Sequence, residues 1–181
     1  GPSESAPTVL SAGGSGRDRQ RPAREEAEEA VRTLLRWLGE DPRPLAVVIG
    51  VAGIGKSALM AKALEGEQRP VLVRRLYPHD DAHGILSTFA DFLARQGRRR
   101  LKSVLARPAY DPVEAMAVLR DDLAGCVVSL DDLHACPPAE GVMASLLEKP
   151  LPFKLLLGTR TQPAFYDRGE LQEGGILEVP L

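Results

Sequence analysis

Five short, mainly apolar runs alternate with longer segments of mixed polarity along the chain. The runs cover residues 45–49, 71–76, 126–130, 153–158 and 176–180. Short apolar runs of this kind are typical of strands that are buried on both faces of a parallel sheet. Strands that alternate with helices form right-handed βαβ units, which place helices on both faces of the sheet. The pattern therefore predicts an α/β fold with about five strands in a mostly parallel sheet.

The segments between these runs carry the signals of helices. Helical spacing and end signals predict helices over about residues 22–40, 56–64, 79–96, 111–123 and 137–147. Asp80 or Asp81 is expected to cap the third helix, which leaves His79 and His83 in solvent. Histidines four residues apart can also hold zinc, but the two aspartates between them favour the cap. Trp37, the sole tryptophan, is expected to pack the first helix on the domain, with stacking on adenine as the alternative.

The chain is expected to contain one folded domain after a flexible tail. Residues 1–22 consist mainly of Ser, Gly, Pro, Ala and Arg and show no apolar periodicity. Such a segment cannot bury enough surface to offset the entropy of ordering it. Gly1-Pro2 resembles the remnant of a tag removed by a protease, so these residues are predicted to be a flexible tail or an expression-derived linker. Residues 23–181 then form the domain, which we expect to be a piece of a longer protein.

Composition and charge exclude several classes of protein. The chain has 181 residues and a formal net charge of −2, so no global basic field indicates nucleic acid. No apolar stretch approaches the ~20 residues that a membrane helix needs, and the first residues do not resemble a secretory signal. Cys126 and Cys136 do not make a disulfide framework and are interpreted as reduced thiols. We therefore expect a cytoplasmic protein without a membrane partner.

A glycine-rich loop between the first strand and the second predicted helix carries the clearest chemical signal. Gly50, Gly55, Lys56 and Ser57 satisfy the spacing of a phosphate-binding loop, in the expected strand–loop–helix context. Successive backbone N–H groups at a helix N-terminus form a nest for an anion. Lys56 supplies a charge for the β- and γ-phosphates, and the Ser57 hydroxyl can bind magnesium. The strand and helix that flank the loop disfavour a chance match. The residues predicted to bind nucleotide are Gly50, Val51, Ala52, Gly53, Ile54, Gly55, Lys56, Ser57 and Ala58.

The third strand ends in two acids, Asp131 and Asp132. A first acid at this position typically holds magnesium through water, and a second orients or deprotonates the attacking water. The alternative is a pair of capping aspartates, which the preceding phosphate loop disfavours. We therefore predict Ser57 and Asp131 as the magnesium residues. His134 either hydrogen-bonds Asp132, senses the γ-phosphate or has only a local structural role.

The fourth strand ends in Thr159-Arg160, at the edge where open α/β sheets bind ligands. A guanidinium here can lie near the γ-phosphate and so distinguish a triphosphate from a diphosphate. A surface arginine after a strand is the alternative interpretation. The predicted catalytic residues are Lys56, Asp132 and Arg160.

These three motifs together resemble the signal-transduction ATPases with numerous domains, the STAND class of P-loop NTPases. That class includes the NB-ARC and NACHT modules of immune receptors, and Asp131-Asp132-Leu133-His134 is closer to the NB-ARC and bacterial-regulator type. The resemblance covers about residues 25–181. It departs from the family at Gly16-Arg17-Asp18, which lacks the apolar lead of the motif that seats adenine. Family members also continue into helical and winged-helix domains.

The resemblance implies a molecular switch that holds ADP at rest and ATP when active. It implies slow, magnesium-dependent hydrolysis and self-association of the ATP-bound full-length protein. By matching positions, Lys56 binds phosphate, Ser57 and Asp131 magnesium, Asp132 the attacking water and Arg160 the γ-phosphate. Two alternatives stay open, a catalytically inactive scaffold for protein interactions and, less favoured, a small-molecule P-loop kinase.

A basic run follows the third predicted helix. Single-stranded nucleic-acid sites combine cations with stacking aromatic side chains, and only Phe89 and Phe92 lie nearby in the sequence. We therefore expect a solvated helix end and loop, with an acidic partner or a subunit contact as the alternative, and no nucleic-acid role. The run contains Arg95, Arg98, Arg99, Arg100 and Lys102.

Overall fold

A five-stranded parallel sheet forms the centre of the computed structural model, which describes residues 23–51, 54–167 and 175–181. The strand order is β2-β3-β4-β1-β5, and every neighbouring pair is parallel. The number and direction of the strands confirm the prediction. The predicted tail, residues 1–22, lies outside the described residues. The strands are β1 Leu45–Ile49, β2 Val71–Arg75, β3 Val127–Asp131, β4 Lys154–Thr159 and β5 Ile176–Pro180.

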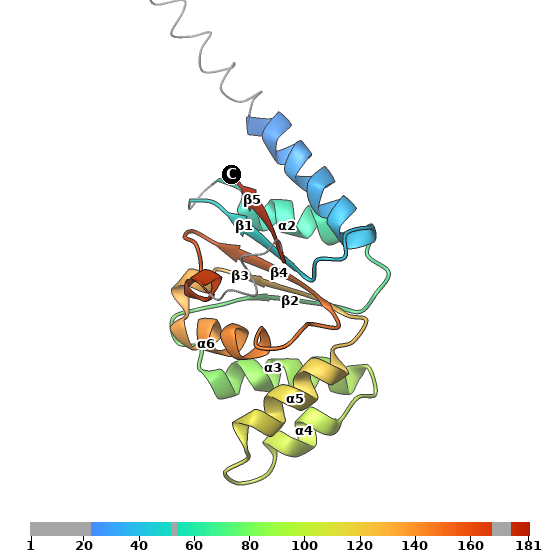
Figure 1. The fold of residues 1–181 in the computed structure, drawn as a ribbon, viewed down its shortest axis with the longest axis vertical. Coiled ribbons are helices and arrows are strands. Elements are labelled where there is room, and N and C mark those ends of the chain that lie inside the picture. The colour runs from blue at the N-terminus through green and yellow to red at the C-terminus, as the bar shows by residue number, and fades with distance from the viewer. Residues whose placement is uncertain (1–22, 52–53, 168–174) are drawn as a thin grey trace, which may run out of the picture.

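Helices cover both faces of this sheet, as the alternating pattern predicts (Figure 1). One face packs against the N-terminal helix, residues 23–39, and against α2, Lys56–Leu64. The other face carries a layer of four helices. They are α3 Ala82–Arg95, α4 Arg100–Leu105, α5 Pro112–Asp122 and α6 Pro137–Leu146.

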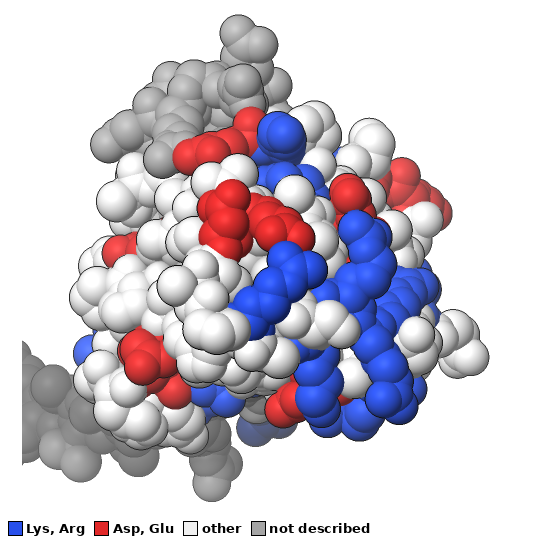
Figure 2. All heavy atoms as spheres, turned by 90° about the horizontal axis from the view of Figure 1, so that it is seen from below, with Lys and Arg blue, Asp and Glu red and all other residues white. Residues whose placement is uncertain are grey.

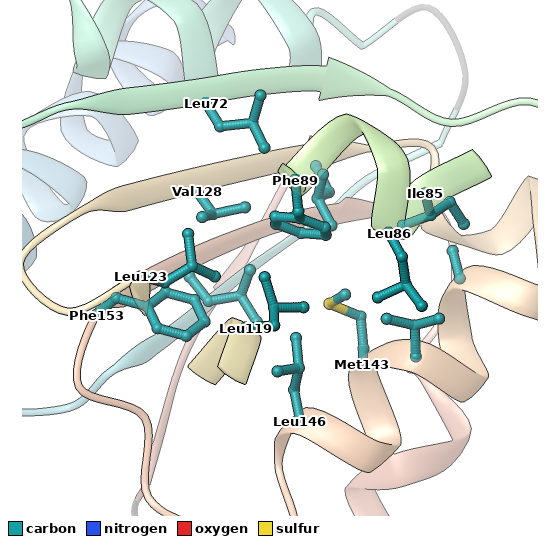
Figure 3. Close-up of a cluster of buried hydrophobic side chains, with 14 of the residues drawn as sticks. Leu72, Ile85, Leu86, Phe89, Leu119, Leu123, Val128, Met143, Leu146 and Phe153 are labelled. Atoms are coloured by element: carbon teal, nitrogen blue, oxygen red, sulfur yellow. The ribbon is translucent and has the colours of Figure 1, made fainter. Parts of the chain in front are cut away.

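A hydrophobic core lies between each helical layer and the sheet, so the domain has two separate cores. Alternate residues of β4 point to opposite sides, so Leu155 and Leu157 lie in one core and Leu156 in the other. This two-sided burial explains why the strand sequences are continuously apolar. The larger core lies between the sheet and the four-helix layer, where Phe89 of α3 and Met143 of α6 meet side chains from the strands (Figure 3).

The basic run forms the predicted helix end and loop from Arg95 to Arg99, but the remainder of the run is helical. Arg100–Leu105 is the helix α4, because Leu101 and Val104 lie one turn apart and are both buried. The helix layer that contains α4 forms the lower side of the molecule, and Figure 2 shows Lys and Arg side chains gathered on that face. Several of these cations have acidic neighbours, such as Asp122 3.0 Å from Arg100 and Asp91 3.5 Å from Lys102.

The predicted helix cap is Asp81. Its carboxylate accepts a hydrogen bond from the N–H of Gly84 at 2.7 Å, at the start of α3. His79 and His83 are both exposed, as expected. His83 forms a 2.9 Å hydrogen bond with the hydroxyl of Tyr110.

Trp37 packs the N-terminal helix against the sheet. Its indole N–H donates to the carbonyl of Arg43 at 2.8 Å, and its side chain is 1% exposed. This position precedes the amino end of β1, whereas the phosphate loop follows the carboxyl end of that strand. The packing prediction is confirmed, and burial leaves no face of the ring for stacking on a base.

Candidate functional site

The strand order brings the three sequence motifs to one edge of the sheet. β4 lies between β1 and β3, so its carboxyl end separates the phosphate loop from the acidic pair. The N–H of Gly50 donates to the carbonyl of Thr159 at 3.0 Å, which ties the start of the loop to the end of β4. Carboxyl ends of parallel strands are where open α/β sheets bind ligands. The motifs far apart in sequence therefore form one site.

The phosphate loop leads directly into α2. Gly55 is the N-cap of this helix and has a φ of 88°, a conformation that glycine adopts without strain. A glycine cap has no side chain to accept the first N–H groups of the helix, which stay available to an anion. At Gly50, a Cβ would lie 2.9 Å from the side chain of Ile54 and 3.3 Å from that of Leu181, so a larger residue there would displace one of its neighbours. Ala52 and Gly53 lie outside the described residues.

Asp131 is the acid to which the phosphate loop is bound. The buried ammonium of Lys56 donates to Oδ1 of Asp131, and the hydroxyl of Ser57 donates to Oδ2. Burial alone would raise the pKa of Asp131, but hydrogen bonds from Lys56, Ser57 and the N–H of Asp132 outweigh it and lower that pKa. The carboxylate therefore carries its charge at neutral pH and can bind a cation.

Asp132 lies beside the same lysine and has a further partner. Its backbone is left-handed, with a φ of 58°, directly after β3. Oδ1 of Asp132 lies 3.4 Å from Nζ of Lys56, and Oδ2 accepts from Nε of Arg75 at 2.6 Å. Arg75 is absent from the predicted site. The sequence signal was its place at the carboxyl end of a strand, but only the pairing of β2 with β3 brings it to Asp131 and Asp132.

His134 and Arg160 meet across the site. The backbone N–H of Arg160 donates to Nδ1 of His134 at 3.2 Å, so the described hydrogen bond of this histidine is to Arg160 rather than to Asp132. Burial lowers the pKa of His134, with further lowering by Arg160 and Lys56, and the nearby acids oppose this. The neutral ring is therefore favoured, and the exposed side chain of Arg160 lines the adjacent cavity.

A cavity of about 590 Å³ opens at this edge of the sheet, a volume typical of a small-molecule site. It contains three cations, from Lys56, Arg75 and Arg160, together with the hydroxyl of Ser57 and the carboxylate of Asp132. The other lining residues are Val51, Gly55, Ala58, Leu76, Tyr77, Pro78, His134 and Ala135.

The residues present suit a polyphosphate with a magnesium ion. Within the described part of the chain, no three His, Cys, Asp or Glu side chains converge to hold a metal by themselves. Magnesium does not require such a cage, because it usually keeps several waters and binds one or two protein oxygens plus phosphates. Ser57 and Asp131 supply oxygens of that kind, beside the loop that would hold the phosphates.

The chain matches no protein-family model and no curated protein sequence. It is similar to several solved structures, at low sequence identity. One is a STAND protein with a tetratricopeptide repeat sensor from Pyrococcus horikoshii, with a TM-score of 0.62 and 18% identity over 83% of this chain and 22% of that chain. A second is Drosophila ORC bound to AT-rich DNA and Cdc6, with a TM-score of 0.64 and 16% identity over 90% of this chain and 57% of that chain.

A third is Drosophila ORC bound to DNA, with a TM-score of 0.62 and 15% identity. It covers 87% of this chain and 93% of that chain. This chain thus spans less than two thirds of the first two proteins. Together with the sheet order, these similarities establish the P-loop NTPase fold. None of the helices in residues 23–51, 54–167 and 175–181 has the length and apolar character needed to cross a bilayer.

Proposed function

We propose that the chain is an ATP- and ADP-binding module that hydrolyses ATP slowly with magnesium and acts as a regulatory switch of the STAND type. The observation that carries this proposal is the meeting of Lys56, Ser57 and Asp131, next to Asp132 and Arg160, at one cavity. Both the composition of the cavity and the fold of the phosphate loop favour a nucleoside phosphate over an apolar ligand.

Each side chain has a role that its position supports. Lys56, which now contacts Asp131, would hold the β- and γ-phosphates of a bound nucleotide, and Ser57 and Asp131 would hold magnesium. Asp132 orients the attacking water, and Arg160 lies where a guanidinium can detect the γ-phosphate. The bound metal would neutralise charge on the phosphates, and the protein would supply orientation.

The regulatory part of the proposal rests on resemblance. The motifs are similar to those of NB-ARC-like modules, and a STAND protein is among the similar solved structures. In this proposal the ATP-bound full-length protein self-associates. The adenine-seating segment would involve Gly16-Arg17-Asp18, which lies outside the described residues.

Calorimetry with Mg-ADP and Mg-ATP tests the proposal on the parent chain and on Lys56→Ala. Lys56 is the buried cation of the loop. Its removal should weaken the binding of both nucleotides by at least about 100-fold, as expected for the loss of a charge-assisted contact. Lys62→Ala is the matched control, since that lysine lies on the same helix and is exposed beside Glu65. Equal binding by Lys56→Ala and the parent would refute the phosphate-loop assignment. No heat with either nucleotide in the parent would favour the inactive scaffold.

A further inference from the structure

Arg75 is a cation at the candidate site that the proposed roles leave unused. It is the last residue of β2, and parallel pairing places it opposite Asp131. The N–H of Leu76 donates to the carbonyl of Asp131 at 2.9 Å, so the two strand ends are joined at this point. The side chain of Arg75 is 64% exposed and lines the cavity, so it is not there to fill a core.

The two carboxylate oxygens of Asp132 have different partners. Oδ2 accepts from Nε of Arg75 at 2.6 Å, whereas Oδ1 lies 3.4 Å from Nζ of Lys56. In the proposed function Lys56 moves to phosphate, which frees Oδ1. Arg75 is not required elsewhere in that function, so Oδ2 stays held. One oxygen is then fixed while the other faces the phosphate end of the cavity.

Asp132 needs such a restraint, because its backbone does not fix its carboxylate. The residue is left-handed and follows the end of β3, and its side chain is only 18% exposed. Its N–H donates to Oδ1 of Asp131 at 2.8 Å, which fixes the peptide but makes no contact with the Asp132 carboxylate. A group that orients a reacting water must be held closely, since small misplacements cost rate.

The neighbouring arginine shows what a purely structural contact looks like on this strand. Arg74 donates to Asp80 at 2.7 Å, and Asp80 also accepts from the N–H of Tyr77 at 2.8 Å. That pair fixes the turn after β2. Arg75 points to the other face of the strand, where it meets Asp132, and its guanidinium lies 5.8 Å from the centre of the Tyr77 ring.

We propose that Arg75 is a positioning residue, which holds Oδ2 of Asp132 so that Oδ1 is directed at the attacking water. The inference rests on the proposed function, because it assigns Asp132 the water. It adds a residue at the end of β2 to the site formed by the loop, β3 and β4. Arg75 itself contacts no nucleotide in this arrangement and acts through Asp132.

The test compares Arg75→Gln with Arg100→Gln by calorimetry. Arg100 is a matched control, because it lies on α4, away from the cavity, and its side chain is 62% exposed. It also forms an ion pair, with Asp122 of α5 at 3.0 Å. The two ligands are Mg-ADP and Mg-ADP with aluminium fluoride, which mimics the transferring phosphoryl group.

Arg75→Gln should leave the Mg-ADP affinity within about twofold and lower the affinity for the analogue about tenfold. Arg100→Gln should change neither affinity. Arg75→Lys should recover part of the loss, because it keeps the charge without the planar donor set.

The same substitution in an Asp132→Asn variant tests whether Arg75 acts through Asp132. In Asp132→Asn, adding Arg75→Gln should change the affinity for the analogue by less than about twofold, because a residue that acts through Asp132 has nothing left to position. An equal loss in both backgrounds would show that Arg75 contacts the ligand directly, and would overturn the inference. An unchanged analogue affinity in Arg75→Gln, with circular dichroism matching the parent, would also overturn it while leaving the proposed function intact. A parent chain that binds no Mg-ADP would refute the proposed function, and the inference with it.

Discussion

Gly158 leaves the space that the Asp131 carboxylate occupies. Gly158 is buried in β4, and a Cβ at this position would overlap Oδ1 of Asp131 and lie 2.7 Å from the sulfur of Met60. The missing side chain lets the carboxylate cross from β3 toward α2, where Lys56 and Ser57 donate to it. The geometry of the candidate magnesium site thus depends on a residue that contacts no ligand.

Gly158→Ala should therefore damage both stability and the site. The added methyl group must displace the carboxylate or Met60, and overpacking of this kind costs about 1–3 kcal/mol of unfolding free energy. Urea unfolding followed by Trp37 fluorescence measures the loss, and Mg-ADP calorimetry should show weaker binding. Gly141→Ala is the control, because it lies in α6 with open space around its Cβ. That change should stabilise the protein by about 0.5–1 kcal/mol. A Gly158→Ala variant as stable as the parent would contradict the prediction.

Asp131→Asn should uncouple the phosphate loop from β3. The amide has no charge and keeps only one acceptor oxygen, so Lys56 loses either this hydrogen bond or the negative charge of its acceptor. Weakening or losing a hydrogen bond of a buried charged group costs about 1–3 kcal/mol. The melting temperature should fall, and ADP affinity should no longer rise when magnesium is added. Asp121→Asn, an exposed position on α5, is the control and should leave both measurements unchanged. A magnesium response equal to that of the parent would remove Asp131 from the metal site.

Leu101→Ala should show that α4 is part of the folded domain. Leu101 is fully buried beneath the basic face, and a buried Leu→Ala change costs about 2–5 kcal/mol through lost burial and a cavity. Leu35→Ala is the control, because Leu35 is 49% exposed and should change stability by less than about 0.5 kcal/mol. Urea unfolding of both variants is the measurement. A similarly small loss of unfolding free energy in both variants would mean that α4 does not pack as described.

The sequence indicates the strands and their shared edge well because that information is local. Each strand is a short run buried on both faces, and the loop from Gly50 to Ser57 carries its own spacing. The α4 helix was not predicted, because four of residues 98–102 are cations and the segment therefore resembles a solvated loop. Only Leu101 and Val104 indicate that one side of it is buried. Its burial depends on packing against α3 and α5, which no local pattern contains.

Arg75 and Gly158 could not be assigned for a different reason. Both act across strands, so their roles follow from the order β2-β3-β4 rather than from their neighbours in sequence. Before that order is known, Arg75 is one of two adjacent arginines at a strand end. Only the structure separates Arg74, which fixes a turn through Asp80, from Arg75, which meets Asp132.

His134 should make stability depend on pH below its ordinary pKa of 6.5. Burial lowers the pKa of the folded state, so the unfolded chain takes up a proton first as the pH falls. The unfolded state then binds more protons, and stability rises with pH through this window. The contribution of the neutral ring is fully present above pH 6.5 and is lost as the pH falls through the folded pKa. Protonation at Nδ1 also removes the acceptor for the N–H of Arg160.

The stability advantage of the parent over His134→Gln should therefore be constant above about pH 7 and shrink toward pH 5, because only the parent has the titrating ring. Thermal unfolding at steps between pH 5 and pH 8 measures this difference. NMR titration of the His134 ring should give a pKa below 6.5, the sign set by its burial. A pKa above that value, or an advantage that grows on acidification, would show that the acids Asp131 and Asp132 control this histidine instead.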